Sequence, residues 1–170
     1  MARSSRNVPK KAGLPGLRIH LGGVAMANDP GRKQLIDGLN QDLAAEYQAV
    51  IAYLLFSRLA NGPLRPELSG FFESEIADEL GHAKLLAQKI VALGGTPTTK
   101  PAEVTLSEDN REMLQISLQA EKDTIERYTQ RIKQAEAAGE LGLKVDLEQL
   151  VSDETRHKED IERMLFGWRE

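Results

Sequence analysis

Two matched sets of glutamate and histidine in this chain have the residue types and the spacing of metal ligands on helices. Each set contains a Glu-x-x-His motif, and a further glutamate precedes the motif glutamate at the same distance in both sets (79 − 46 = 33; 154 − 121 = 33). The second set repeats the first at a constant offset (121 − 46 = 75; 157 − 82 = 75). The six residues are Glu46, Glu79, His82, Glu121, Glu154 and His157. This internal repeat predicts two related helical hairpins that together form one site.

The chemistry of these six side chains indicates a pair of metal ions bound through oxygen and nitrogen. Side chains three residues apart share a helix face, so each Glu-x-x-His pair can hold one ion. Glutamates able to bridge two ions, with one imidazole for each ion, suit first-row transition metals such as iron or manganese. The chain has no cysteine, which excludes thiolate zinc sites, disulfides and cysteine nucleophiles.

All four glutamates are expected to face the interior, because each lies in register with apolar residues of its helix. Glu79, for example, comes three residues after Ile76 and seven before Leu86. Burying unpaired carboxylates together is costly, and no lysine or arginine stands at the inward positions beside them, so metal cations are the expected compensating charge. A single Glu-x-x-His motif more often lies on a solvated helix face. Two matched sets with equal offsets favour a metal site instead.

Other residues near the motifs are candidates for supporting roles. Asp78 and Asp153 each precede a motif glutamate, and we expect them to orient the histidine of the opposite motif through its outer ring nitrogen. Tyr53, two helical turns beyond Glu46, is the strongest candidate for a redox relay. An aromatic residue in such a stripe more often belongs to the core, and Tyr128 is interpreted in that way.

The sequence around the site predicts an all-α fold. Helix-favouring residues dominate positions 32–168, and strand-like alternation is nearly absent. Glycine and proline divide this stretch into helices over about residues 29–61, 66–94 and 107–138 and a fourth after Gly142, with Asp29 and Ser107 as expected N-caps. The apolar residues expected to line the first helix are Leu35, Leu39, Leu43, Val50, Tyr53 and Leu54. Residues 95–106 can cross the length of a bundle, which predicts an up-down-down-up arrangement of two hairpins joined by a long crossover.

The bulk composition indicates one acidic domain with a basic N-terminal tail. The 170-residue chain has a net charge of −4, and residues 1–28 carry five basic residues and no acid, which leaves −4 − 5 = −9 for the remainder. An acidic body attracts cations. We assign residues 1–28 to a flexible tail and residues 29–170 to the bundle. Five basic residues without interleaved aromatics would attract nucleic acid only weakly.

No membrane segment or secretory signal is predicted, so a cytoplasmic location is expected. No stretch approaches the roughly 20 apolar residues that span a bilayer. Arg18 and His20 interrupt the apolar part of the tail, which leaves too short an uncharged run for a signal peptide. Met26 is an alternative translation start.

From residue 32 to about residue 166 the chain resembles the ferritin-like superfamily, and most closely bacterioferritin, in its repeated glutamate and Glu-x-x-His motifs. The resemblance implies a ferritin-like bundle in which the six residues bind two iron ions per chain as a ferroxidase centre. Glu79 and Glu154 would be the bridging carboxylates. It also implies that this centre oxidises Fe(II) with oxygen or hydrogen peroxide, for iron storage or detoxification. Subunits of that family assemble into a homo-oligomeric shell, and manganese is the alternative metal here.

The sequence departs from that pattern at several points, which define the alternatives. Bacterioferritins carry a haem-binding methionine directly after the first motif glutamate, and this chain has Leu80 there, so haem is not expected. The chain ends at Glu170, too soon after His157 for the fifth helix of bacterioferritins. The sequence therefore does not predict whether the subunits form a closed shell. A rubrerythrin-like peroxidase usually has an extra glutamate where this chain has Thr124. A mini-ferritin-like, DNA-associated stress protein would share the basic tail but binds its metal between subunits.

Overall fold

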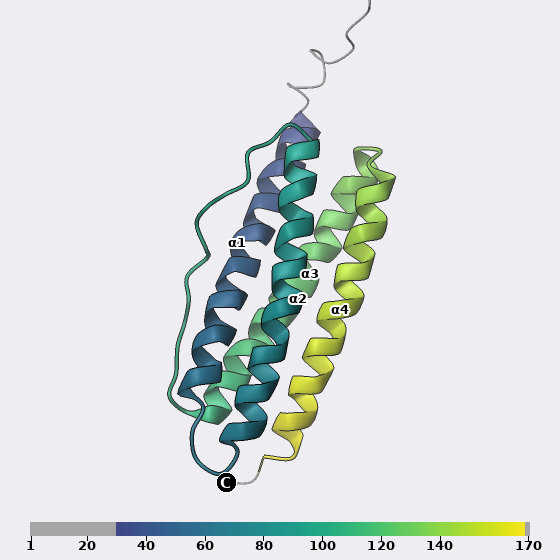
Figure 1. Cartoon of the computed structure of the whole chain (residues 1–170). Coiled ribbons are helices and arrows are strands. Elements are labelled where there is room, and N and C mark those ends of the chain that lie inside the picture. The colour runs from purple at the N-terminus through teal and green to yellow at the C-terminus, as the bar shows by residue number, and fades with distance from the viewer. Residues whose placement is uncertain (1–29, 169–170) are drawn as a thin grey trace, which may run out of the picture.

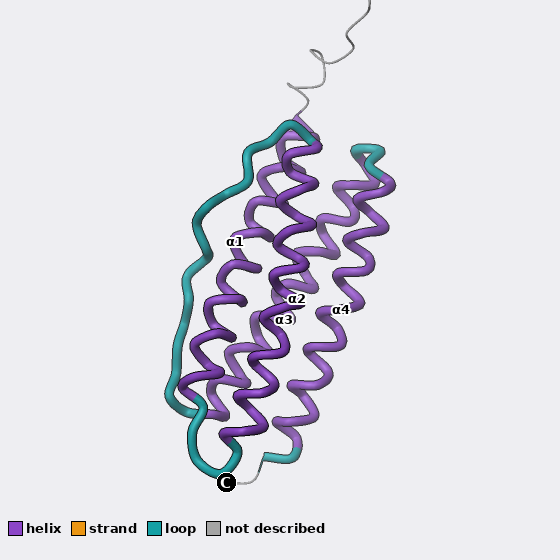
Figure 2. The backbone as a smooth tube through the Cα atoms, viewed as in Figure 1, coloured by secondary structure: helices purple, strands orange, loops and turns teal. Residues whose placement is uncertain are grey.

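Four long helices make up almost all of the computed structural model, which describes residues 30–168. They are α1 (Pro30–Leu59), α2 (Arg65–Ala92), α3 (Asn110–Ala137) and α4 (Leu141–Phe166). Figures 1 and 2 show them lying side by side as a bundle, with no strand among the described residues. The predicted all-α fold is confirmed.

The order and direction of the helices follow the predicted up-down-down-up arrangement. The helices α1 and α2 form one antiparallel hairpin, α3 and α4 form the other, and the connection between them runs along the whole length of the bundle beside α1 (Figure 1). Two hydrogen bonds from its backbone N–H groups hold this crossover against α1: Ala102 N–H donates to Ala44 O at 2.8 Å, and Thr98 N–H donates to the side-chain Oδ1 of Asn40 at 2.7 Å. The crossover therefore fixes α3 parallel to α2, which brings the two repeated halves face to face.

The helix ends differ from the prediction by a few residues. The helix α1 ends at Leu59 and not at about Asn61, and Gly62 then turns the chain with a φ of 65°. Ser107 was expected to cap α3, but the N-cap is Asp109, whose side chain accepts a hydrogen bond from Glu112 N at 2.7 Å. Ser107 instead accepts from Asp109 N at 3.0 Å, so it supports the turn before the cap. The predicted cap Asp29, the basic tail and Met26 lie outside the described residues.

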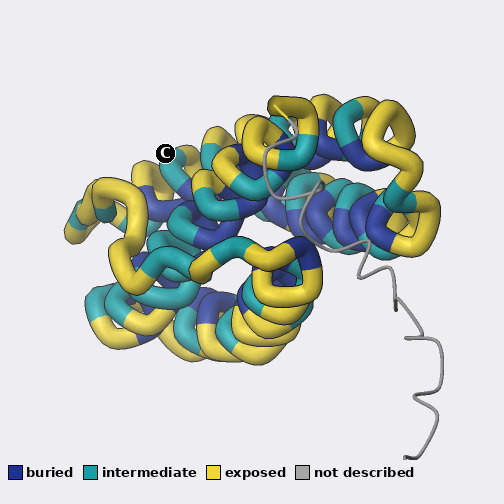
Figure 3. The backbone as a smooth tube through the Cα atoms, turned by 90° about the horizontal axis from the view of Figure 1, so that it is seen from above, coloured by how far each residue is buried: buried dark blue, intermediate teal, exposed yellow. Residues whose placement is uncertain are grey.

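Two apolar clusters fill the bundle interior, one toward each end. The first contains large buried side chains from all four helices, among them Leu39, Leu86, Tyr128 and Leu147. The second is built in the same way from Phe56, Phe72, Leu114 and Ile161. In each helix the buried glutamate falls between the stretches that feed these clusters. Figure 3 shows the buried positions where the helices face one another. Because the buried glutamates lie between the two clusters, the middle of the bundle is a polar layer between two apolar ones.

Two predicted core positions of α1 are wrong. Leu54 is 47% exposed, and Val50 is only half-buried. The buried stripe includes Tyr53, as predicted, and also Ala52 and Phe56, which were not predicted. Over a helix of 30 residues a period of 3.6 places some apolar residues beside the stripe, and sequence spacing does not separate them from the core. None of the helices in the described part of the chain is long and apolar enough to cross a membrane.

Candidate metal centre

The four glutamates of the repeated motifs meet in the polar layer, one from each helix. Glu46, Glu79, Glu121 and Glu154 are each no more than 3% exposed. Each occupies the inward position near the middle of its helix, where the sequence pattern placed it. An interior with four carboxylates has to be compensated, because burying charge without a partner is strongly unfavourable.

The two histidines complete two overlapping groups of four side chains. In each group one oxygen or nitrogen atom per residue lies within 4.8 Å of the others. One group is Glu46, Glu79, His82 and Glu154, and the other is Glu79, Glu121, Glu154 and His157. Glu79 and Glu154 belong to both groups, so the geometry describes two adjoining subsites with two shared carboxylates.

Within these groups, both histidines turn Nδ1 toward the shared glutamates. His82 Nδ1 lies 3.0 Å from Glu154 Oε1 and 3.2 Å from Glu79 Oε2. His157 Nδ1 lies 3.1 Å from Glu154 Oε2 and 3.6 Å from Glu79 Oε1. The two rings are nearly parallel, with centroids 6.1 Å apart. Each ring therefore presents one nitrogen to the centre and the other to the outside of the cluster.

In the metal-free protein, protons compensate the charge of this cluster. Burial acts to lower the pKa of His157, but contacts with Glu154 and Glu79 outweigh it and raise the pKa to about 11. Burial acts in the same direction on His82, and its contacts with Glu154, Glu46 and Glu79 raise that pKa well above the usual value. Both imidazoles are thus positively charged at neutral pH.

The four carboxyl groups divide into two kinds. Burial acts to raise the pKa of Glu79, but contacts with His157 and His82 outweigh it and lower the pKa to about 2. The pKa of Glu154 is lowered against burial in the same way. Burial dominates at Glu46 and Glu121 and raises each pKa well above the usual value. The metal-free cluster thus pairs two imidazolium ions with two carboxylates and keeps two carboxyl groups protonated.

Two buried tyrosines hold the two outer glutamates in place. The hydroxyl of Tyr53 donates to Glu121 Oε1, and the hydroxyl of Tyr128 donates to Glu46 Oε1. Both tyrosines are no more than 2% exposed. Tyr53 was a candidate from the sequence, whereas Tyr128 was interpreted as a core aromatic. The constant offset between the two halves was a usable signal, because 53 + 75 = 128.

The two aspartates expected to orient the opposite histidines lie on the predicted side, but at unequal distances. Asp78 Oδ2 lies 3.6 Å from His157 Nε2, and Asp153 Oδ2 lies 3.9 Å from His82 Nε2. Neither distance is that of a hydrogen bond. Glu75, which was not among the predicted residues, lies nearer, with Oε2 3.2 Å from His157 Nε2. It stands four residues before Glu79, so its helical register was the signal that could have found it.

A buried ion pair next to the cluster was also missed. Arg131 is 4% exposed, and its Nε donates to Asp42 Oδ2 at 2.7 Å, where Asp42 is fully buried. An inward arginine thus exists on α3, three residues beyond Tyr128. Its charge is committed to Asp42, so it does not neutralise the four glutamates. Asp42 precedes Glu46 by one helical turn, and the pair ties α1 to α3 beside the site.

The residues present fit a pair of divalent metal ions. Two buried carboxylate oxygens, Glu79 Oε1 and Glu154 Oε1, accept no well-aligned hydrogen bond from the residues that the structure describes, and they belong to the two glutamates shared by both groups. Buried acceptors without donors are rare in proteins, and a bound cation would satisfy both. The donor set of four carboxylates and two imidazoles suits iron or manganese.

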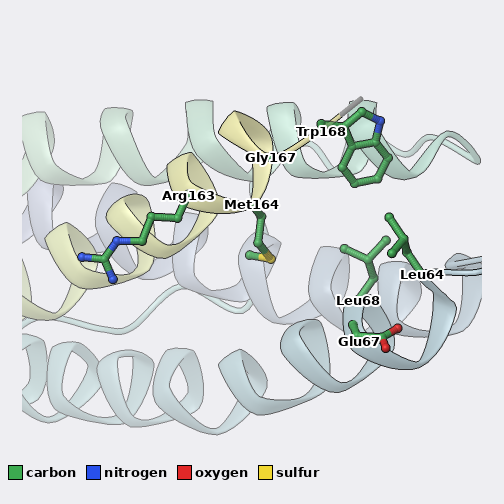
Figure 4. Close-up of a pocket in the computed structure, with 7 residues that line it drawn as sticks. All are labelled: Leu64, Glu67, Leu68, Arg163, Met164, Gly167 and Trp168. Atoms are coloured by element: carbon green, nitrogen blue, oxygen red, sulfur yellow. The ribbon is translucent and has the colours of Figure 1, made fainter. Parts of the chain in front are cut away.

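A separate cavity of about 440 Å³ lies between the start of α2 and the end of α4 (Figure 4). Its lining is mostly apolar and includes Leu64, Leu68, Met164 and Trp168. None of the six clustered residues lines it. This cavity therefore gives no access for an organic substrate to the candidate metal centre.

Comparisons with known proteins agree with this architecture. The sequence pattern of the Ferritin family, described as a ferritin-like domain, matches residues 36–167. The bacterioferritin of Streptomyces coelicolor is 28% identical over 141 residues, which cover 82% of this chain and 83% of that protein. The bacterial ferritin of Neisseria meningitidis serogroup B is 30% identical over 108 residues, or 64% of this chain and 70% of that protein.

Two solved structures are similar over most of the chain. A ferritin-like, diiron-carboxylate protein from Bacillus anthracis is 49% identical, with a TM-score of 0.79, and the match covers 81% of this chain and 99% of that one. The bacterioferritin of Rhodobacter capsulatus, described with a metal-free dinuclear site and haem iron, is 27% identical with a TM-score of 0.73. That match covers 78% of this chain and 84% of the bacterioferritin chain.

Proposed function

This chain belongs to the ferritin family, and from that premise we propose that it is a ferroxidase, which oxidises Fe(II) to Fe(III) for iron storage or detoxification. The observation that carries the proposal is the pair of overlapping groups that share Glu79 and Glu154. Two subsites joined by two carboxylates suit two ions that react together. Two Fe(II) ions held there would supply the two electrons that reduce oxygen to hydrogen peroxide, or hydrogen peroxide to water.

In this proposal each side chain has a defined role. Glu79 and Glu154 bind both ions, while the remaining four residues serve one ion each: Glu46 and His82 in one subsite, Glu121 and His157 in the other. Both imidazoles and both outer carboxyl groups must release their protons before they can act as ligands. The apolar clusters above and below the polar layer limit access of water to the site and keep the ligands in place.

Tyr53 is the proposed redox relay. Its hydroxyl donates to Glu121, so a proton can pass to that carboxylate if the ring gives up an electron. Burial raises the pKa of Tyr53 well above its usual value, which keeps the phenol protonated until it is oxidised. Tyr128 occupies the corresponding position in the other half, where its hydroxyl donates to Glu46. A substitution of Tyr128 is therefore the matched comparison for a substitution of Tyr53.

Two observations weigh against the family alternatives. A rubrerythrin-like peroxidase would have a fifth carboxylate one turn beyond Glu121, and Thr124 stands there, its hydroxyl accepting a hydrogen bond from Arg127 at 2.7 Å. A mini-ferritin-like protein would share its site between subunits, whereas both groups here are complete within one chain. Manganese remains the alternative metal, because oxygen and nitrogen ligands serve both ions.

Two further proposals concern haem and assembly. Leu80 has no donor atom for a haem iron, which supports a protein without haem at this position. Several large apolar side chains, including Leu54 at 47% and Leu80 at 40% exposure, lie on the outside of α1 and α2. Exposed apolar residues on neighbouring helices support a homo-oligomer, whose subunit number is measured by light scattering in solution.

The experiment that tests the proposal is an anaerobic titration with Fe(II), followed by exposure to oxygen. The wild-type protein is expected to bind about two irons per chain and to oxidise them rapidly. Glu79→Ala, which removes a ligand of both subsites, is expected to lose both binding and oxidation. Glu126→Ala is the matched control, because Glu126 lies exposed on α3. No stoichiometric binding, or equal oxidation by Glu79→Ala, would overturn the proposal.

A further inference from the structure

The two repeated halves differ at a buried position that faces one histidine of the metal centre. All six candidate ligands match at one constant offset, but the same offset pairs Glu75 with Leu150 (75 + 75 = 150). Glu75 is 9% exposed, and Leu150, at 4%, belongs to an apolar cluster. At this position one half therefore adds a buried carboxylate to the site, and the other half adds an apolar side chain.

This extra carboxylate lies against one histidine and not the other. Glu75 Oε2 is 3.2 Å from the outer nitrogen of His157, within the range of a hydrogen bond. The corresponding nitrogen of His82 is 3.9 Å from Asp153 Oδ2. Asp153 is moreover held by its own helix, since it accepts hydrogen bonds from Arg156 and Gln149. The two rings thus have unequal support.

The surroundings of Glu75 also favour a hydrogen bond to His157. Its Oε2 atom is buried, and among the described residues no well-aligned donor forms a hydrogen bond to it, so the Nε2 proton of His157 is the donor within reach. Asp78, the other carboxylate near His157, lies farther from the ring, at 3.6 Å, and its side chain is 61% exposed. An exposed side chain is solvated and orients a ring weakly. Glu75 is therefore the group placed to fix the ring of His157.

We propose that Glu75 is a positioning residue: it accepts the Nε2 proton of His157, leaves Nδ1 to face the centre, and makes the His157 subsite the tighter of two unequal metal subsites. A carboxylate on the outer nitrogen of a ligating histidine fixes its tautomer and makes the ring a stronger ligand. The inference rests on the proposed di-metal function and adds that its two ions bind in order, the first beside His157.

Cobalt(II) titration of the full-length, metal-free protein tests this, because the visible absorption of cobalt(II) reports its ligands without any redox reaction. The wild-type protein is expected to bind two ions in two distinguishable steps. Glu75→Leu, which copies the other half, should weaken the first step by about 10- to 100-fold, the usual loss when such a partner is removed. Glu75→Gln keeps an acceptor oxygen and should weaken it less. Glu73→Gln serves as the control, because Glu73 lies exposed on the same helix, and it should leave both steps nearly unchanged.

Single-histidine backgrounds identify the subsite. Glu75→Leu should weaken the ion that remains in His82→Ala and should have no effect on the ion that remains in His157→Ala. A merely structural role would weaken both equally, and that result, or two equal steps in the wild type, would overturn the inference. A wild-type protein that binds fewer than two ions would instead overturn the proposed function. If Glu75→Leu does not fold, the nearly isosteric Glu75→Gln decides the question by the same comparison.

Discussion

The hydroxyl of Tyr53 on α1 donates a hydrogen bond to Glu121 on α3, across 68 residues of sequence. Its counterpart Tyr128 on α3 donates to Glu46 on α1. Each tyrosine follows the glutamate of its own helix by the same two turns (53 − 46 = 7; 128 − 121 = 7) and contacts the glutamate of the opposite helix. The internal repeat thus includes the groups that hold the outer ligands as well as the ligands themselves.

Removing either hydroxyl should loosen an outer ligand. We expect Tyr53→Phe to destabilise the metal-free protein by about 1–3 kcal/mol, because it leaves a buried carboxyl oxygen without its donor. Urea unfolding followed by circular dichroism measures the loss. Tyr47→Phe is the control, since Tyr47 is only half-buried and lies outside the cluster. Equal stability of Tyr53→Phe and the wild type would show that the hydrogen bond does not hold Glu121.

The stability of the metal-free protein should fall as pH rises from about 5 to 8. Glu46 and Glu121 keep their protons in the folded state, whereas the unfolded chain loses them near the usual pKa of 4.5. The stability that His157 contributes is complete below its usual pKa of 6.5 and is lost as pH rises toward its folded pKa of about 11. Glu79, with a pKa lowered to about 2, is ionised in both states across this window and adds no slope.

The folded state therefore binds more protons than the unfolded state throughout this range, and each such group contributes up to about 1.4 kcal/mol per pH unit. Thermal melting after chelation should give a lower Tm at pH 8 than at pH 5.5. Loading with two divalent ions should remove this trend, because the ions replace the protons. A Tm of the metal-free protein that rises over the same range would contradict the charge state assigned to the cluster.

Gly38 makes room for the buried arginine beside the site. A Cβ atom at this position would collide with the guanidinium of Arg131, so Gly38→Ala must displace a group that is paired with Asp42. Breaking one side of a buried ion pair costs about 3–5 kcal/mol, and we expect a loss of that size. Gly70→Ala is the matched control, because no atom of the described residues outside its own stretch of helix lies within 4 Å of the added Cβ atom. It should be neutral or stabilising by about 0.5–1 kcal/mol. Urea unfolding measures the free energy of unfolding of both variants. A small effect of Gly38→Ala would show that Arg131 can adopt another conformation without losing its pairing with Asp42.

The basic tail should be dispensable for the metal chemistry. All six candidate ligands lie at Glu46 or beyond, so deletion of residues 1–25 is expected to leave Fe(II) binding and oxidation unchanged. Any retention of DNA should disappear with the tail and should weaken steeply with salt, as phosphate contacts do. Loss of oxidation on deletion would show that the site is not self-contained.

The repeated spacing was enough to predict the helices, their order and the inward position of the four glutamates. A period of 3.6 fixes which face of a helix is buried, and the equal offsets fix which residues meet. Contacts between helices depend instead on rotation and axial shift, which spacing does not fix. Glu75 and Tyr128 were therefore missed as neighbours of the site, although both lie in register with its ligands. The prediction that Leu54 belongs to the core was wrong, because sequence spacing does not distinguish an apolar residue beside the buried stripe from one within it.

The Arg131–Asp42 pair shows a second limit of the sequence. An arginine within a helical pattern normally lies on the solvated face, and its burial here depends on an acid 89 residues away and on a glycine that makes space. Neither partner is marked by a motif. Such pairs become visible only once the helices are placed against one another.

The most direct test of the central claim is a crystal structure of the protein soaked with Fe(II) under anaerobic conditions, with anomalous scattering measured at the iron edge. We predict two anomalous peaks per chain in the middle of the bundle. One should lie among Glu46, Glu79, His82 and Glu154, and the other among Glu79, Glu121, Glu154 and His157. A single peak, or peaks only at surface carboxylates, would contradict a di-metal centre with shared glutamates.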